Sequence, residues 1–546
     1  MTALYTPAGM RAPRLAGPLL RMLAEALENP VSGPPLAARL MQDAGISRIY
    51  QPAEDVPPGQ HPVFEACGGA PTGPAMPAPE ALARLPQAPR GFGFTTVADF
   101  ETAYREGLTD PEAVAERVLA AIAQDEAADR PLRAFIAQRP DDLRSQAAAS
   151  AARWRAGRQL GPLDGVPVAI KDEVDLAGYP TWVGTSFLGT HPASRDAEVV
   201  ARLRAAGALL LGKANMHEIG LGVTGFNPHH GTARNPYDPG RYPGGSSSGS
   251  AVATAAGYCP LALGADGGGS IRIPAALCGL VGLKPTFGRL SVRGAATLCW
   301  SVDALGPIAA TARDAALAYA IMAGPDPADP DSRLQPAPHL AGLDQGDLKG
   351  LRLGVFRPWF EDADPEVVSR CSSLLSALAE AGAEIVEITL PDLGLVGPTH
   401  SVTIVTEMLT AHLSHYEKRR RDYGLDVRVN LALARQMRGY DYVQAQRHRM
   451  RIYRHFAASL SGVDAILTPA TGIAAPPIAP DALPDGESDL EKLDAIMRFA
   501  RAANLTGLPA ISMPAGYTGD GLPVGLQAMG RPWEEHVLLR IARVAE

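Results

Sequence analysis

The residues that could do chemistry gather between positions 161 and 290 of the 546-residue chain. Lys171 ends the apolar run VPVAI, and only six of the 50 basic residues are lysine, so this chain uses arginine where either would serve. Apolar surroundings favour the neutral amine, which accepts a proton as a guanidinium does not. Lys171 is therefore a candidate base. The alternative is an ordinary ion pair with Asp172 or Glu173.

Two loops rich in serine and glycine accompany this lysine. They read YPGGSSSGSA over residues 242–251 and GADGGGSIRIPA over residues 264–275, and an expected strand at 260–263 precedes the second. Consecutive glycines let several N–H groups converge on one point, as an oxyanion hole requires. The expected donors are the N–H groups of Gly267, Gly268, Gly269 and Ser270. Ser270 is the candidate nucleophile, whereas either loop alone would be interpreted as a flexible turn.

Two other glycine patterns fit their usual functions poorly. Gly245, Ser247 and Gly249 satisfy GxSxG, but the polar stretch PYDPGRYP stands where that motif needs a hydrophobic strand. GxGxxG is satisfied between residues 220 and 225, yet FNPHHGTARNP follows and cannot open a helix toward a pyrophosphate. Neither an α/β-hydrolase elbow nor a dinucleotide site is expected.

Histidines near the first loop raise the question of a metal. His217 and Glu218 lie close to His229 and His230, but HEIGL lacks the second histidine of HExxH. We interpret these histidines as structural or pocket-lining and expect no metal. The basic run 418–421 is flanked by acidic residues, which favours a solvated helix face.

Alternating patterns describe the elements that must position these residues. β-rich runs at 166–170, 208–211, 351–355 and 384–390 alternate with helical stretches such as 365–381. Thr109, Asp110 and Pro111 are typical of a helix start. The chain is thus expected to be an α/β protein with a mixed sheet enclosed by helices.

The first 92 residues are expected to form a mainly helical extension. Leu15, Leu19, Leu23 and Leu27 follow one another at four-residue spacing and indicate an amphipathic helix over 14–28, packed on the main domain or a dimer partner. Residues 52–90 are rich in Pro, Gly and Ala and indicate a surface connector. The predicted domains are therefore 1–92 and 93–546.

Composition narrows the class of protein. The formal net charge of −8 gives no global basic surface, so no nucleic-acid partner is expected. The five cysteines contain no CxxC pair, which is typical of reduced residues in a cytoplasmic protein. No secretory signal and no run of roughly 20 apolar residues is found, so stable membrane insertion is not expected. The sequence does not decide whether the chain forms a homodimer.

Five segments of the sequence resemble the motifs of a known protein family. In chain order they read GPLDGVPVAIKD, GKANMHEIGLGVTG, GTARNPYDPGRYPGGSSSGSA, ALGADGGGSIRIPAALCGLVGLKPTFGRLS and NLTGLPAISMPAGYTGDGLPVGLQ. They resemble the amidase signature family, in that family's order, over roughly residues 93–546. The resemblance implies an amidase signature fold and an enzyme that hydrolyses small-molecule amides without a cofactor.

The resemblance also implies roles for individual residues. Ser270 would be acylated, Lys171 would be the terminal base, and Ser246, joined to Gly245 by a cis peptide, would relay the proton. A hydroxyl can donate to one neighbour while accepting from another, which agrees with this relay. The supporting residues would be Ser247, Gly245, Asp266 and Arg272. The chain departs from the family's usual Thr or Ser at Ala265, which could alter how the second loop is braced.

Within the family, the motifs and the long N-terminal extension are most similar to plant-type fatty acid amide hydrolases. This similarity favours substrates with a medium or long acyl chain or a bulky aryl group. Residues 296–305 and 401–450 are expected to build the pockets. Two alternatives stay open, namely an amidotransferase A-type subunit whose glutaminase activity depends on a partner, and a non-catalytic scaffold.

Overall fold

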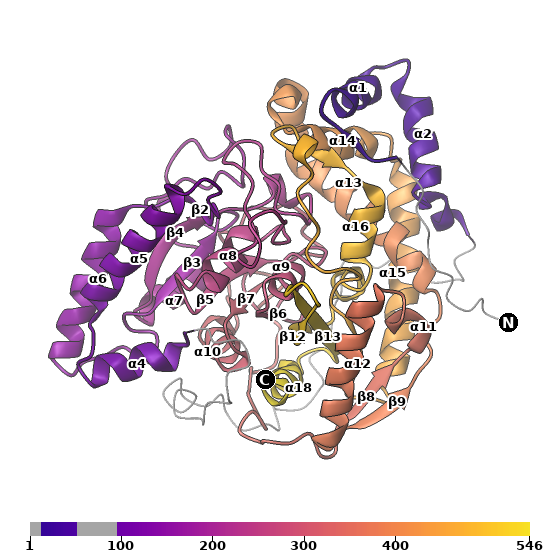
Figure 1. Ribbon diagram of the computed structural model, residues 1–546. Coiled ribbons are helices and arrows are strands. Elements are labelled where there is room, and N and C mark those ends of the chain that lie inside the picture. The colour runs from indigo at the N-terminus through magenta and orange to yellow at the C-terminus, as the bar shows by residue number, and fades with distance from the viewer. Residues whose placement is uncertain (1–12, 52–94) are drawn as a thin grey trace.

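An eleven-stranded sheet runs through the computed structural model, which describes residues 13–51 and 95–546 (Figure 1). In sheet order its strands are β2 (Phe135–Ala137), β4 (Leu209–Ala214), β3 (Pro167–Lys171), β5 (Leu261–Ala265), β7 (Leu305–Ala309), β6 (Val281–Lys284), β12 (Ala510–Tyr517), β13 (Pro523–Gly530), β10 (Ala465–Pro469), β8 (Arg352–Val355) and β9 (Glu384–Glu387). A separate two-stranded sheet pairs β1 (Leu15–Ala16) with β11 (Glu487–Ser488).

The direction of three central strands creates the site. β3 runs parallel to β5, and β5 pairs antiparallel with β7 so that Ala265 lies opposite Leu305. The end of β3, the end of β5 and the start of β7 therefore meet at one edge of the sheet. All three strands are buried along their whole length, which is why their sequences are apolar runs rather than alternating patterns. The mixed sheet expected from the sequence is confirmed.

Helices enclose this sheet. In chain order they are α1 (Gly17–Glu28), α2 (Gly33–Asp43), α4 (Val97–Arg105), α5 (Pro111–Glu126), α6 (Pro140–Arg155), α7 (Glu198–Ala205), α8 (Ser248–Ala255), α9 (Arg272–Leu277), α10 (Ala312–Met322), α11 (Arg357–Phe360), α12 (Pro365–Glu380), α13 (Leu393–Arg419), α14 (Leu425–Ala434), α15 (Gly439–Leu460), α16 (Leu490–Met497), α17 (Arg501–Thr506) and α18 (Glu535–Ala545). Figure 1 shows α4, α5 and α6 at one end of the molecule and the long helices α13 and α15 at the other. None of the described helices combines the length and the apolar character needed to cross a membrane.

The start of α5 follows its sequence signal. The Asp110 side chain accepts the N–H of Ala113 at 2.8 Å, and Pro111 occupies the first helical turn, where its missing N–H costs nothing. Val114, Val118 and Ile122 then form the buried face. The predicted helix start is confirmed.

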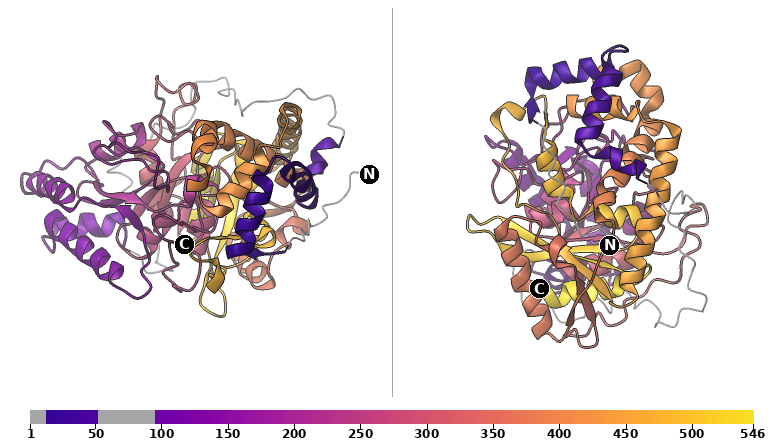
Figure 2. Two further views of the ribbon diagram at one scale, coloured as in Figure 1. Left: turned by 90° about the horizontal axis from the view of Figure 1, so that it is seen from above. Right: turned by 90° about the vertical axis from the view of Figure 1, so that its right-hand side faces the viewer.

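The N-terminal helix exists, but its predicted buried stripe is wrong at Leu19. In α1, Leu20, Ala24 and Leu27 are buried, whereas Leu19 is 60% exposed. A strict four-residue spacing drifts around a helix of 3.6 residues per turn, so only part of the leucine series can face one side. The buried residues pack on α14 of the same chain, and Figures 1 and 2 show the indigo helices α1 and α2 beside the orange helices α13–α15.

Several predictions fall on residues that the structure does not describe. The connector at 52–90, the boundary near residue 92 and Cys67 all lie outside the described ranges. The four other cysteines are buried and have free thiols. The run 418–421 is exposed, as expected of a solvated helix face.

Candidate active site

Lys171 stands at the centre of a buried polar cluster at the end of β3. Its Nζ donates to Ser246 Oγ at 2.9 Å and to the carbonyl oxygen of Ala265 at 3.1 Å. It also lies 2.7 Å from Glu173 Oε2. The three side chains are buried, Lys171 and Ser246 being 1% exposed and Glu173 2%. The ion pair considered from the sequence therefore exists, but it is buried and coexists with the contact to serine.

The other two lysines of the motif region have different surroundings. Lys213 lies 3.5 Å from Asp172, and its Nζ donates to the carbonyl of Val174 at 2.5 Å. Lys284 Nζ donates to the carbonyl of Pro285 at 2.8 Å, and burial lowers its pKa to about 7. Of the lysines in the part of the chain that the structure describes, only Lys171 contacts a serine of the two loops.

The first loop is tied to the second by Ser247. Its Oγ donates to the carbonyl of Ala265 at 3.1 Å and accepts the N–H of Ala265 at 3.2 Å, while its own N–H donates to the carbonyl of Ser270 at 3.2 Å. The peptide bond between Gly245 and Ser246 is cis. These contacts use only backbone atoms of residue 265. Any residue at that position can therefore make them, including the alanine found here.

Asp266 fixes the conformation of the second loop through hydrogen bonds to its backbone. Its buried carboxylate accepts the N–H groups of Gly269 at 2.6 Å and Ile271 at 3.1 Å. It also accepts Arg272 Nε at 3.0 Å and Asn504 Nδ2 at 2.9 Å. Burial alone would raise the pKa of Asp266, but the guanidinium of Arg272 holds it well below its usual range. Two N–H groups of the loop thus donate to an ionised carboxylate, that of Asp266.

This arrangement corrects one predicted oxyanion donor. The N–H of Gly269 is engaged by Asp266, which needs donors because a buried carboxylate without hydrogen bonds is costly. It is therefore not free to bind an oxyanion. The predicted donors that bond no protein acceptor within residues 13–51 and 95–546 are the N–H groups of Gly267, Gly268 and Ser270.

His400 of α13 braces the same loop from the other side. Its Nε2 lies 2.8 Å from the carbonyl oxygen of Gly267 and must donate to it, since a carbonyl only accepts. Burial lowers the pKa of His400 to about 4, so the ring is neutral at physiological pH. The sequence did not single out this residue, because it lies 133 positions from the glycine that it contacts.

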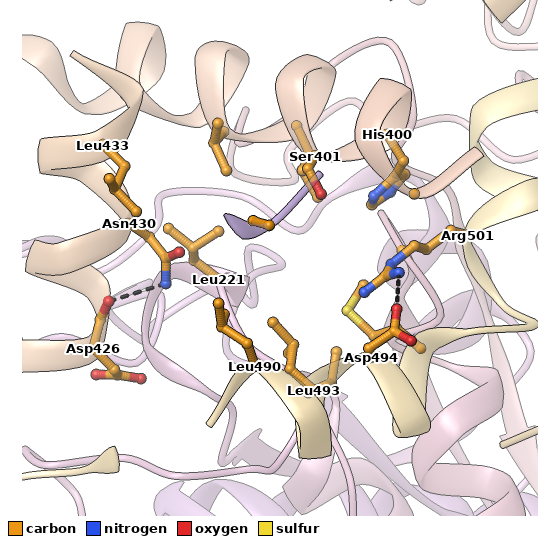
Figure 3. A pocket seen from close by; sticks show the side chains of 18 of the residues that line it. Leu221, His400, Ser401, Asp426, Asn430, Leu433, Leu490, Leu493, Asp494 and Arg501 are labelled. Atoms are coloured by element: carbon orange, nitrogen blue, oxygen red, sulfur yellow. Dashed lines mark hydrogen bonds and ion pairs between the residues drawn. The ribbon is translucent and has the colours of Figure 1, made fainter. Parts of the chain in front are cut away.

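A cavity of about 390 Å³ opens above these loops. Lys171, Ser246 and Ser270 line it, and Ser270 Oγ makes no hydrogen bond to the described protein atoms. Figure 3 shows side chains of α13, α14 and α16 pointing into it, with leucines from three different segments. The leucines labelled there are Leu221, Leu433, Leu490 and Leu493. Both regions expected to build pockets contribute, through Leu298 and Asp303 from one and Ser401 and Asp426 from the other.

Leucines before and within the N-terminal helices also reach this cavity. Leu15, Leu23 and Leu40 line it, together with Met41 and Ile46. Residues 13–51 of the extension therefore form part of the cavity wall and also cover α14.

The histidines near the first loop are paired with protein groups. His217 Nε2 lies 2.9 Å from Asp426 Oδ2, and His229 Nε2 lies 2.8 Å from Glu218 Oε1. His230 Nε2 lies 2.9 Å from the carbonyl of Thr185. Within the described ranges, no three His, Cys, Asp or Glu side chains are grouped so as to hold a metal ion.

Comparison with known proteins identifies the family. The family model described as Amidase matches residues 116–539. The chain belongs to the amidase family. This membership makes it an amide hydrolase, and it confirms the resemblance on which the fold and the enzyme class were predicted.

Individual proteins of this kind resemble the chain over most of its length. The chain is 39% identical to a fatty acid amide hydrolase of Oryza sativa subsp. indica, over 99% of this chain and 94% of the relative. It is 37% identical to one of the subunits of the glutamyl-tRNA(Gln) amidotransferase of Chloroflexus aggregans, over 82% of this chain and 95% of that protein. The structure of the peptide amidase of Stenotrophomonas maltophilia is similar with a TM-score of 0.73 at 30% identity, over 84% and 97% of the two chains.

Proposed function

We propose that the protein hydrolyses amides with a hydrophobic acyl or aryl group through an acyl-enzyme on Ser270. The observation that carries the catalytic part is the contact of 2.9 Å between Lys171 Nζ and Ser246 Oγ, beside a serine whose hydroxyl opens onto a cavity. A serine hydroxyl becomes a useful nucleophile when a base takes its proton.

The proposed proton route uses Ser270, Ser246 and Lys171 in turn. Ser270 Oγ attacks the carbonyl carbon while its proton passes to Ser246 Oγ and the proton of Ser246 passes to Lys171 Nζ. The N–H groups of Gly267, Gly268 and Ser270 stabilise the oxyanion. When the C–N bond breaks, the lysinium returns the proton through Ser246 to the leaving amine. Water then attacks the acyl-enzyme by the same route and releases the acid.

The cavity wall supports a hydrophobic substrate. Its leucines come from the loop after β4, from α14, from α16 and from the N-terminal helices, so apolar side chains of several segments line the cavity that Ser270 also lines. The similarity to the rice fatty acid amide hydrolase extends over 99% of the chain and so includes the N-terminal helices that line the cavity. That whole-length similarity favours a free-standing amidase over an amidotransferase component that depends on a partner.

Replacement of Lys171 by arginine tests the catalytic part. Arginine keeps the positive charge but does not deprotonate, so Lys171→Arg should lower kcat for an N-acyl amide by about 10²- to 10⁴-fold. Lys171→Met, which removes the charge and keeps the length, should be equally inactive. Thermal melting of both variants checks that they fold. Normal single-turnover acylation in the arginine variant would place the base elsewhere, with His217 the next candidate.

A further inference from the structure

We propose that Glu173 and Asp303 form a carboxyl pair that positions the Lys171 amine and stabilises the ammonium formed when Lys171 takes the proton. This inference rests on the proposed function of Lys171 and adds two positioning residues to it. Glu173 is the group that contacts Lys171, and Asp303 is a neutral acid that orients Glu173.

Glu173 is held rigidly against the amine. Its Oε2 lies 2.7 Å from Lys171 Nζ, and only 2% of the residue is exposed. Its backbone carbonyl accepts the N–H of Ala296 at 2.8 Å, which ties the turn after β3 to the segment before β7. A carboxylate fixed in this way leaves the amine little freedom to turn away from Ser246.

Asp303 approaches Glu173 from the start of β7. Both side chains line the cavity beside Lys171, and the carboxyl group of Asp303 interacts with that of Glu173. Two neighbouring carboxyl groups can share a hydrogen bond only when one of them carries a proton, because an ionised carboxylate only accepts. Burial and the negative charge of Glu173 raise the pKa of Asp303 well above its usual range. Asp303 Oδ1 accepts the N–H of Ala304 at 2.9 Å, so the acid proton is available for Glu173. A pair that shares one proton carries a single negative charge, and in this proposal the proton is on Asp303.

A single negative charge beside the amine compensates the positive charge that Lys171 acquires when it accepts the proton. In the neutral form of Lys171 that the proposed function requires, the cluster of amine and carboxyl pair has a net charge of −1. After Lys171 accepts the proton, the cluster is neutral, and the new ammonium lies against a carboxylate. The carboxylate of a serine protease triad supports its histidine by the same principle. Two ionised carboxylates would instead hold the ammonium too firmly for it to act as a base.

Other ionisable groups surround the cluster and are paired elsewhere. Asp266 is bound by Arg272, and Glu407 accepts Ser301 N–H at 3.0 Å and Tyr442 O–H at 2.9 Å. Lys284 and the thiol of Cys299 complete the groups whose charges act on this region. None of these replaces Glu173 at the amine, because Nζ contacts only the three groups named above among the described residues.

The test is the pH dependence of Ser270 labelling by a fluorophosphonate probe, which reports activation of the nucleophile without depending on the substrate. Glu173→Gln should lower the plateau rate by about 10²-fold and move the midpoint of the acidic limb about one unit to lower pH, because the charge favouring the ammonium is gone. Asp303→Asn should leave that midpoint in place, since an amide replaces a neutral acid and still donates to Glu173. Asp303→Ala, which cannot donate, should lower the plateau rate.

Glu407→Gln is the matched control, because it removes a buried carboxylate of the same region that does not contact Lys171. It should leave the midpoint of the acidic limb unchanged. A Glu173→Gln protein with the wild-type profile would overturn the inference, and so would a large shift in Asp303→Asn, which would mean that Asp303 is ionised. If Glu173→Gln does not fold, the two Asp303 variants decide. A wild-type protein that is not labelled at Ser270 would overturn the proposed function instead.

Discussion

Asp266, Arg272 and Asn504 hold the second loop in the conformation on which the proposed chemistry depends. Asp266 accepts hydrogen bonds from two backbone N–H groups and from the side chains of Arg272 and Asn504. Asp266 and Arg272 are fully buried. Removing one partner of such a pair leaves the other charge buried without compensation.

Asp266→Asn should therefore destabilise the protein by about 3 to 5 kcal/mol. Asp422→Asn is the control, because Asp422 is 43% exposed and pairs with Arg419 at the surface. That change should alter stability by no more than about 1 kcal/mol. Thermal melting of the two variants at neutral pH compares them. Equal melting temperatures for both variants and the wild type would contradict the role given to Asp266.

Some residues that line the candidate site were identifiable in the sequence and others were not. Lys171 was identifiable because a rare lysine ends an apolar strand, and Ser270 because it ends a run of glycines. The engagement of Gly269 by Asp266 was not predictable, because loop composition does not reveal which N–H groups turn inward. Asp303 lies 130 positions beyond Glu173 in the chain. The parallel pairing of β3 with β5 and the antiparallel pairing of β5 with β7 together bring these two residues to the same edge of the sheet.

At the scale of elements, α1 joins the N-terminal segment to the cavity wall. Its buried face packs on α14, which also supplies Asn430 and Leu433 to the cavity. The prediction of a helix was correct because amphipathic character is a local property. The prediction of its buried residues was wrong at Leu19, because the face that is buried is decided by α14, which lies far away in the sequence.

Leu20→Asp should weaken the docking of α1 and with it the binding of long acyl chains. In the wild type, each added methylene should raise kcat/KM for N-acyl amides by up to about fourfold until the cavity is filled, since a buried methylene contributes about 0.8 kcal/mol. The variant should show a shallower series and an unchanged rate for the shortest amide. The measurement is kcat/KM from acetyl to palmitoyl amides below their aggregation limits.

Leu19→Asp is the matched control, because the neighbouring leucine is 60% exposed on the same helix. It should reproduce the wild-type series. A flat series in the wild type would reject the hydrophobic substrate and leave the amide hydrolase intact. An unchanged series in Leu20→Asp would dismiss α1 as part of the substrate pocket.

At the scale of the whole molecule, one mixed sheet brings together groups from distant parts of the chain. The edge where β3, β5 and β7 meet holds the lysine, the backbone of Ala265 and the carboxyl pair, and the helices beyond it close the cavity. The fold class was predictable because the apolar runs and helical stretches alternate. The order of the strands was not, since eleven strands permit many arrangements and no local pattern distinguishes them.

The most direct test of the account is to trap the acyl-enzyme. The purified chain alone, mixed with a long-chain N-acyl amide and quenched within its first turnover, should carry one acyl group, and peptide mass spectrometry should locate it on Ser270. Ser270→Ala should fold with an unchanged circular dichroism spectrum, form no adduct and release no product. An adduct on another residue, or amide turnover by Ser270→Ala near the wild-type rate, would contradict the central claim.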